Sequence, residues 1–246
     1  MSIDPRLAER RREVAEDRAR RKVGRLLRLL IALGLVGAAA WLVLSPFLSV
    51  EEVTTAGIGV SSAHNVLVEH DVVAGTPMIL IRPKQIEAAL KTDPWIREAV
   101  VQLDWPTRVV VRVEERAPTA WLPTTGGWGR FAVDGVQLSS APEPDASLPW
   151  IELGVVAIPE DATSGLMLGA LEFVTALPED LRQGTRVRVE ADGELWAEVG
   201  GFQVRLGRAV EMTAKALSLA ALIREQPAAG SILTLIAPTH PAVSPP

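Results

Sequence analysis

Residues 94–121 read PWIREAVVQLDWPTRVVVRVEERAPTAW. Two segments of this stretch, Ile96–Leu103 and Thr107–Glu114, are rich in valine, and Asp104-Trp105-Pro106 between them is a turn sequence. In the second segment every other residue is a valine that could face a core: Val109, Val111 and Val113. This alternation predicts two adjacent strands of a sheet that is packed under helices on one face and ends before Ala117-Pro118.

The residues upstream of this stretch predict one more strand and two helices. A strand near Val50 and Val53 would end at Gly57, and a serine at position 61 or 62 would cap a short helix that runs to about Glu69. Pro83 favours the start of a second helix, which would stop before Asp93-Pro94. Residues 47–116 therefore predict a compact β-α-α-β-β domain, near the lower size limit for independent folding.

The residues downstream predict a second domain, over 117–238, of mixed α+β class with an antiparallel sheet. Its hairpin signals are Asp134-Gly135, Asp192-Gly193 and Gly200-Gly201. Alternating apolar residues predict a three-stranded meander over 186–206, and helical periodicity predicts helices over 165–177 and 209–224. An apolar run predicts a last strand over 232–237. The proline-bounded tail, 239–246, is predicted to be flexible and to pair no further.

The N-terminal part predicts a membrane anchor. Residues 1–28 carry ten basic and five acidic side chains, whereas Leu29–Val50 carries no charge. The apolar run Leu26–Leu44 is interrupted by Arg28, and as a helix it would cover roughly 28 Å, about one hydrocarbon core. We predict a transmembrane helix over 26–46 with residues 1–25 as a basic cytoplasmic segment, because the next basic residue is Arg82.

Two other interpretations of this segment fit its residues less well. The small residues Ala38–Ala40 could be the cleavage site of a secretory signal, but the apolar run continues through Leu44, which favours a retained anchor. The basic lead could bind nucleic acid, but acidic residues alternate with its cations and it contains no aromatic residue. We therefore predict a single-pass membrane protein with its bulk outside the cytoplasm and no nucleic-acid partner.

The composition excludes several chemistries. The chain of 246 residues has no cysteine and no tyrosine, and it has three histidines. Thiol chemistry, zinc-cysteine sites and iron-sulfur clusters are thereby excluded, and few side chains remain for acid-base catalysis near neutral pH. Gly126–Gly129 lacks the lysine of a phosphate loop, and the spacing of His64 and His70 suits no shared metal. We predict no enzyme, no cofactor, no metal and no catalytic residue.

A series of short motifs behind the predicted anchor resembles the FtsQ/DivIB family of bacterial cell-division proteins. The motifs are, in order, Phe47-Leu48-Ser49-Val50, Gly75-Thr76-Pro77, Pro94-Trp95-Ile96, Trp105-Pro106, Glu115-Arg116-Ala117-Pro118, and Leu206-Gly207-Arg208 before a helix that contains Lys215. The resemblance implies a POTRA domain over about 47–116, followed by the family's β domain. It also implies a non-enzymatic divisome scaffold in the cytoplasmic (inner) membrane, enriched at the division septum, that links early and late division proteins and acts on no small-molecule substrate.

The resemblance further implies a binding edge for the partners FtsB (DivIC) and FtsL. In the family a partner adds a strand near the C-terminus, beside the arginine of the Leu-Gly-Arg motif. The candidate residues carried over are Arg208, Ile232, Leu233, Thr234, Leu235 and Ile236. An apolar last strand with no successor would present unpaired backbone groups, which an added strand would satisfy. The alternative that residues 232–236 form an interior strand remains open.

Two other functions are weighed against the scaffold. A POTRA-type chaperone or transport module usually accompanies a membrane β-barrel, and the sequence lacks amphipathic strands of about ten residues in sufficient number. A cell-envelope hydrolase would need titratable groups that converge in a cleft. Ser61, His64 and Asp71 carry the residue types of a hydrolase triad without its nucleophile elbow, so the scaffold is favoured.

Overall fold

The computed structural model describes residues 27–42, 45–153, 160–190 and 192–245. The chain divides into two compact units. The first comprises the chain up to Ile58, together with Ser62–Leu90 and Ala99–Val113. The second comprises Gly59–Ser61, Lys91–Glu98 and Glu114–Pro246. The predicted cytoplasmic segment, 1–25, lies outside the described residues.

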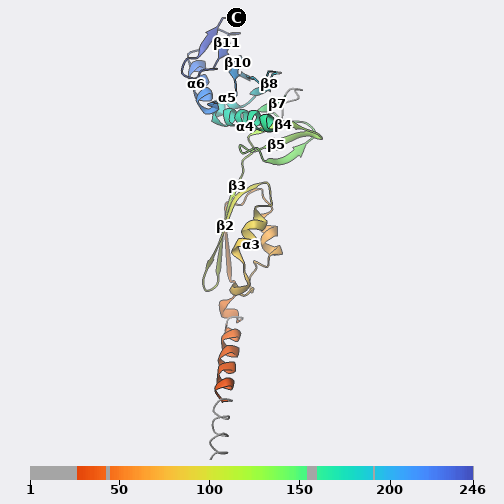
Figure 1. Cartoon of the computed structure of the whole chain (residues 1–246), viewed down its shortest axis with the longest axis vertical. Helices are drawn as coiled ribbons and strands as arrows, with labels where there is room; N and C mark the ends of the chain where they lie inside the picture. The colour runs from red at the N-terminus through yellow and green to blue at the C-terminus, as the bar shows by residue number, and fades with distance from the viewer. Residues whose placement is uncertain (1–26, 43–44, 154–159, 191, 246) are drawn as a thin grey trace, which may run out of the picture. The chain divides into compact units, whose positions relative to one another are not determined.

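The first unit is built on a three-stranded sheet covered by two helices. The strand order is β1-β3-β2, and β1 runs parallel to β3. The predicted alternation is confirmed, because the three odd-numbered valines of β3 are buried together with Leu67, Ile86 and Leu90 of the helices. The β-α-α-β-β order is also as predicted (Figure 1). The elements are β1 (Glu52–Ala56), α2 (Ala63–Glu69), η2 (Met78–Leu80), α3 (Pro83–Leu90), β2 (Ile96–Asp104) and β3 (Arg108–Glu115).

A helical segment and a short 3-10 turn precede this sheet. Residues 27–42 are helical, and their side chains are exposed. The turn η1 covers Pro46–Leu48. Within the described part of the chain, no helix has both the length and the apolar character needed to cross a bilayer. The predicted span, 26–46, includes residues 26, 43 and 44 outside that part, so the transmembrane helix stays a prediction.

The second unit is built on a nine-stranded sheet of order β12-β11-β10-β9-β8-β7-β4-β5-β6. Its strands are β4 (Ala120–Thr124), β5 (Gly127–Phe131), β6 (Gln137–Ala141), β7 (Trp150–Leu153), β8 (Arg186–Val189), β9 (Leu195–Val199), β10 (Phe202–Gly207), β11 (Ile232–Thr234) and β12 (Ala242–Ser244). Its helices are α4 (Glu160–Ala176), α5 (Glu179–Arg182) and α6 (Met212–Arg224). The predicted meander is confirmed, because β8, β9 and β10 pair antiparallel in that order.

The prediction of an antiparallel sheet is wrong for part of this unit. Three neighbouring pairs are parallel: β4 with β7, β7 with β8, and β10 with β11. The last two pairs are parallel because a helix connects them, α4 between β7 and β8 and α6 between β10 and β11. Parallel neighbours need such a crossover. The sheet is therefore mixed.

One face of this sheet carries the hydrophobic core of the unit. The helices α4 and α6 lie along that face (Figure 1), where Phe173, Val174 and Leu219 pack with strand residues such as Val187 and Val204. Gly169 allows α4 to pack closely against the loop between β10 and α6, because a Cβ at this position would lie 2.6 Å from the Cβ of Ala209. The opposite face of β8, β9 and β10 is free of these helices, and polar side chains and Trp196 occupy it.

Candidate partner-binding edge

The C-terminal edge of the nine-stranded sheet ends on β12 and not on β11. In the structure Leu233 pairs with Val204 of β10 on one side and with Val243 of β12 on the other. The predicted uncovered margin is therefore wrong for Ile232–Thr234, where the interior alternative is right, and the prediction that the tail pairs no further is wrong for Ala242–Ser244. The physical reason is that Ala242–Ser244 keep their backbone N–H groups between Pro241 and Pro245, so this part of the tail can form a ladder.

The candidate strand residues differ in what they offer to another chain. Leu233 and Leu235 are fully buried in the core cluster, so their side chains pack against the core and are not accessible to another chain. Ile232 and Thr234 are partly exposed, and Ile236 is 49% exposed. All three residues of β12 are exposed. The accessible surface of the edge thus consists of β12 and of every second residue of the 232–236 run.

The residues after β11 are fixed against the end of β10. The amide of Leu235 donates to the carbonyl of Arg205 at 2.8 Å, and the Ser218 hydroxyl of α6 donates to the carbonyl of Pro238 at 2.8 Å. Gly207 has a φ of 68°, and a Cβ there would lie 3.2 Å from Cγ1 of Ile236. Glycine adopts this left-handed φ without strain, whereas residues with a Cβ rarely do. Ile236 is thereby placed beside the residue that precedes Arg208.

Arg208 lies in a loop, four residues before α6 begins at Met212. This differs from the expected helix start near residue 209, because Glu211 adopts a left-handed conformation with a φ of 55° and delays the first turn. The Arg208 side chain is exposed, and within the described residues its guanidinium makes no ion pair or hydrogen bond. A free guanidinium in the loop after β10 can bind a carboxylate of another chain through two parallel hydrogen bonds.

Lys215 holds the loop that presents Arg208. Its ammonium is buried and donates to the carbonyls of Leu206 at 2.7 Å and Arg208 at 2.8 Å. Burial lowers the pKa of Lys215, and attraction to Glu211 opposes that change. The sequence motif had singled out this lysine without giving it a role. The sequence signal for this role was its position, because residues 212, 215, 216, 219 and 220 form the buried stripe of α6 and Lys215 is the charged residue among them.

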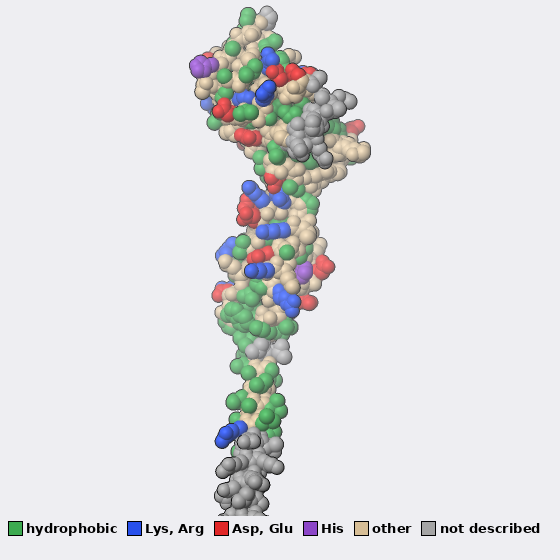
Figure 2. Space-filling view, in the orientation of Figure 1, with side chains coloured by type: hydrophobic (Ala, Val, Ile, Leu, Met, Phe, Trp, Pro, Cys, Tyr) green, Lys and Arg blue, Asp and Glu red, His purple; other side chains and the backbone are tan. Residues whose placement is uncertain are grey.

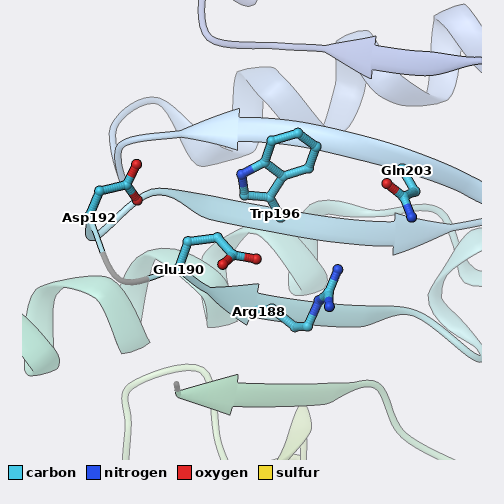
Figure 3. Close-up of a pocket in the computed structure, with 5 residues that line it drawn as sticks. All are labelled: Arg188, Glu190, Asp192, Trp196 and Gln203. Atoms are coloured by element: carbon cyan, nitrogen blue, oxygen red, sulfur yellow. The ribbon is translucent and has the colours of Figure 1, made fainter. Parts of the chain in front are cut away.

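The open face of the sheet beside this edge is hollowed and polar. Figure 3 shows the five side chains that line the hollow, from β8, β9, β10 and the β8–β9 turn: Arg188, Glu190, Asp192, Trp196 and Gln203. Next to it, Arg205 pairs with Glu194 at 2.7 Å and lies over the ring of Trp196. Among the described residues, no group of three or more His, Asp or Glu side chains is placed to hold a metal.

Comparison with known proteins agrees with the predicted POTRA domain and shows the family of the chain. Residues 48–116 match the family model of the FtsQ-type POTRA domain. Cell division protein FtsQ of Mycobacterium bovis is 30% identical to this chain over 214 residues, which are 84% of this chain and 67% of the relative. The chain belongs to the FtsQ family. The resemblance read from the motifs is thereby confirmed.

Two further FtsQ relatives differ in length from this chain. FtsQ of Streptomyces griseus is 29% identical over 210 residues, which are 81% of this chain and 99% of the relative. FtsQ of Mycobacteroides abscessus is 28% identical over 202 residues, which are 81% of this chain and 64% of the relative. These FtsQ relatives are cell-division proteins by name, so membership of the family supports a role in the divisome.

Proposed function

We propose that the chain is a non-enzymatic scaffold of the divisome that is required for septum formation and links early with late division proteins. Family membership supports this role, because the relatives are cell-division proteins. In this proposal residues 47–116 act as the POTRA domain and residues 117–238 as the β domain. The tail, 239–246, contributes the outermost strand of the sheet.

The scaffold is proposed to sit in the cytoplasmic membrane at the division septum, with residues 26–46 as its anchor. The exposed apolar side chains of residues 27–42, such as Leu33, Leu35 and Trp41, support an apolar environment for this helix. The cations before it support a cytoplasmic N-terminus. A reporter at the N-terminus and one inserted after residue 46 should report opposite compartments. Equal signals from both would reject this topology.

The partners are proposed to be FtsB (DivIC) and FtsL, one of which adds a strand to the outer edge of β12. The observation that carries this proposal is the position of β12 at the end of the sheet order with all three residues exposed. Among the described residues no strand pairs with its outer side, so a row of backbone donors and acceptors is available to a second chain.

Side chains next to the edge are proposed to give this contact its specificity. Ile232, Thr234 and Ile236 offer partly exposed surface beside β12, while Leu233 and Leu235 hold the strand in place from the core. Arg208 is proposed to pair with an acidic residue of the partner, because its guanidinium is exposed and no described residue engages it. The loop that carries it is fixed by Lys215.

Capture of the partner by the full chain in membranes tests the edge. Deletion of residues after His240 removes β12 and should abolish capture, and Arg208→Glu should reduce it. Arg224→Glu is the matched control, because Arg224 is an exposed arginine at the end of α6 in the same unit, and it should leave capture unchanged. Undiminished capture by the truncated chain would show that the partner does not pair with β12.

Depletion of the protein in cells tests the scaffold role itself. Loss of a link between early and late components should give filamentous cells in which the late division proteins are missing from the septum. Normal constriction after depletion would reject the assignment.

A further inference from the structure

Four large apolar side chains are exposed at one end of the first unit although the unit has a buried core of its own. Phe47, Ile79, Leu80 and Trp105, hereafter the apolar tip, are between 50% and 76% exposed. In the 3-10 turn η2, Met78 and the following Ile81 are buried, so the core of this region is already filled without Ile79 and Leu80. Figure 2 shows hydrophobic atoms gathered at this end of the unit.

Three segments that are distant in sequence converge on this end through backbone contacts. Ser49 bridges to Pro77, which places η1 beside η2. The amide of Val50 donates to the carbonyl of Thr76 at 2.8 Å, and the amide of Glu51 donates to the carbonyl of Thr107 at 2.8 Å. The second bond brings the β2–β3 turn, with Trp105, to the same end. The tip is therefore a feature of the folded unit and not a run of adjacent residues.

The tip lies directly after the helical segment 27–42. The amide of Ser45 donates to the carbonyl of Leu42 at 3.2 Å, and the amide of Leu48 donates to the carbonyl of Ser45 at 3.1 Å. Phe47 follows Leu42 by five residues, so the chain keeps Phe47 within about 18 Å of the end of that segment. Where this helix leaves an apolar phase, the tip is therefore close to the boundary of that phase.

We propose that the apolar tip inserts into the outer leaflet of the membrane at the level of the lipid headgroups, so that the first unit rests on the bilayer. This inference rests on the proposed anchor. A tryptophan with aliphatic neighbours suits that depth, because the indole places its apolar ring in the acyl region and its N–H near the headgroups. Shallow burial of about 5–10 Å is typical of apolar faces bound in this way.

The charges around the tip permit this contact with a lipid surface. Arg108 pairs with Glu52 at 2.9 Å and with Asp104 at 3.6 Å, so two of the nearby carboxylates are compensated. Glu51 and Asp71 stay exposed, and Asp71 lines a hollow together with Leu80. The exposed Arg82 and Lys84 follow η2 as cations that offset these two carboxylates at an anionic lipid surface.

Site-directed fluorescence on the full chain in lipid vesicles tests this proposal. The native chain has no cysteine, so a single engineered cysteine carries the only dye. Leu80→Cys reports on the tip and Leu35→Cys on the helix, and Val100→Cys is the matched control because Val100 is an apolar residue of the same unit with 42% exposure. Each variant is labelled with an environment-sensitive dye, in vesicles with and without nitroxide lipids.

The expected result is quenching at Leu80 by nitroxides placed near the headgroup, at least about two-fold stronger than at Val100. Leu35 should be quenched by nitroxides placed deep in the acyl chains. Equal quenching at Leu80 and Val100 would overturn the insertion of the tip. A blue-shifted but unquenched dye at Leu80 would also overturn it, because protein and not lipid would then cover the tip. An unquenched dye at Leu35 would instead reject the anchor.

Discussion

The carboxylate of Glu115 should contribute measurably to stability near neutral pH and lose that contribution in acid. This residue ends β3 and accepts hydrogen bonds from the amides of Gly59 at 2.9 Å, Val60 at 3.0 Å and Ser61 at 2.9 Å, and from the Ser61 hydroxyl. Burial alone would raise its pKa, but these donors together lower the pKa from 4.5 to about 2. The carboxylate thus fixes the loop before α2.

The size of the effect follows from the change in pKa. A fall from 4.5 to about 2 corresponds to an upper bound of about 3 kcal/mol in the free energy of unfolding. Water reaches part of this carboxylate, and screening reduces the expected value to about 1–2 kcal/mol. Because the pKa is lowered in the folded state, this stability is complete above about pH 4.5 and is lost as the pH falls toward 2.

The measurement is urea unfolding of the full chain in detergent, followed by tryptophan fluorescence. Glu115→Gln should unfold with a free energy about 1–2 kcal/mol lower than the native chain near neutral pH, and the difference should shrink below about pH 4.5 and be largely lost near pH 2. Glu114→Gln is the control, because the exposed Glu114 pairs with the exposed Arg97 at 3.5 Å and should matter by less than about 1 kcal/mol. A difference that persists unchanged in acid, or one no larger than the control's, would refute the assigned role.

Three further substitutions should act through contacts in the second unit. Lys215→Met removes the donor to the carbonyls of Leu206 and Arg208, of which the Arg208 carbonyl keeps its bond from the Val210 amide. The substitution should lower the free energy of unfolding by about 1–3 kcal/mol, measured by urea unfolding, with reduced partner capture. Gly207→Ala forces a side chain to a φ of 68° beside Ile236 and should cost about 1–2 kcal/mol in the same assay. Arg116→Ala removes the guanidinium that lies 2.8 Å from Asp134 and should raise the pKa of that carboxyl, measured by NMR titration.

The parts of the fold that follow local periodicity were predictable from the sequence. The alternation of Val109, Val111 and Val113 identified β3, and Pro83 marked the first residue of α3. The hairpin turns were also predictable, because Asp192-Gly193 lies between β8 and β9 and Gly200-Gly201 lies between β9 and β10. In each case the decisive residues are neighbours in the chain.

The parts that depend on distant pairing were not predictable. Nothing local distinguishes Ala242–Ser244 as a strand, because three residues between prolines carry little strand preference and their partner β11 lies beyond an intervening loop. The parallel neighbours of β7 and β10 likewise depend on where the crossover helices return the chain. For the candidate site, the motif located Arg208, but the contact between Gly207 and Ile236 and the carbonyl bonds of Lys215 needed the three-dimensional structure.

The position of β12 determines when the protein can bind a partner along this edge. Every other described element precedes β12 in the chain, yet β12 forms the outermost row of the sheet. If the chain crosses the membrane with its N-terminal part first, β12 joins the sheet after the preceding strands of the unit have emerged and folded. A partner that binds along this row would therefore join molecules whose second unit has already folded, and would not bind those in which β12 has not yet joined the sheet.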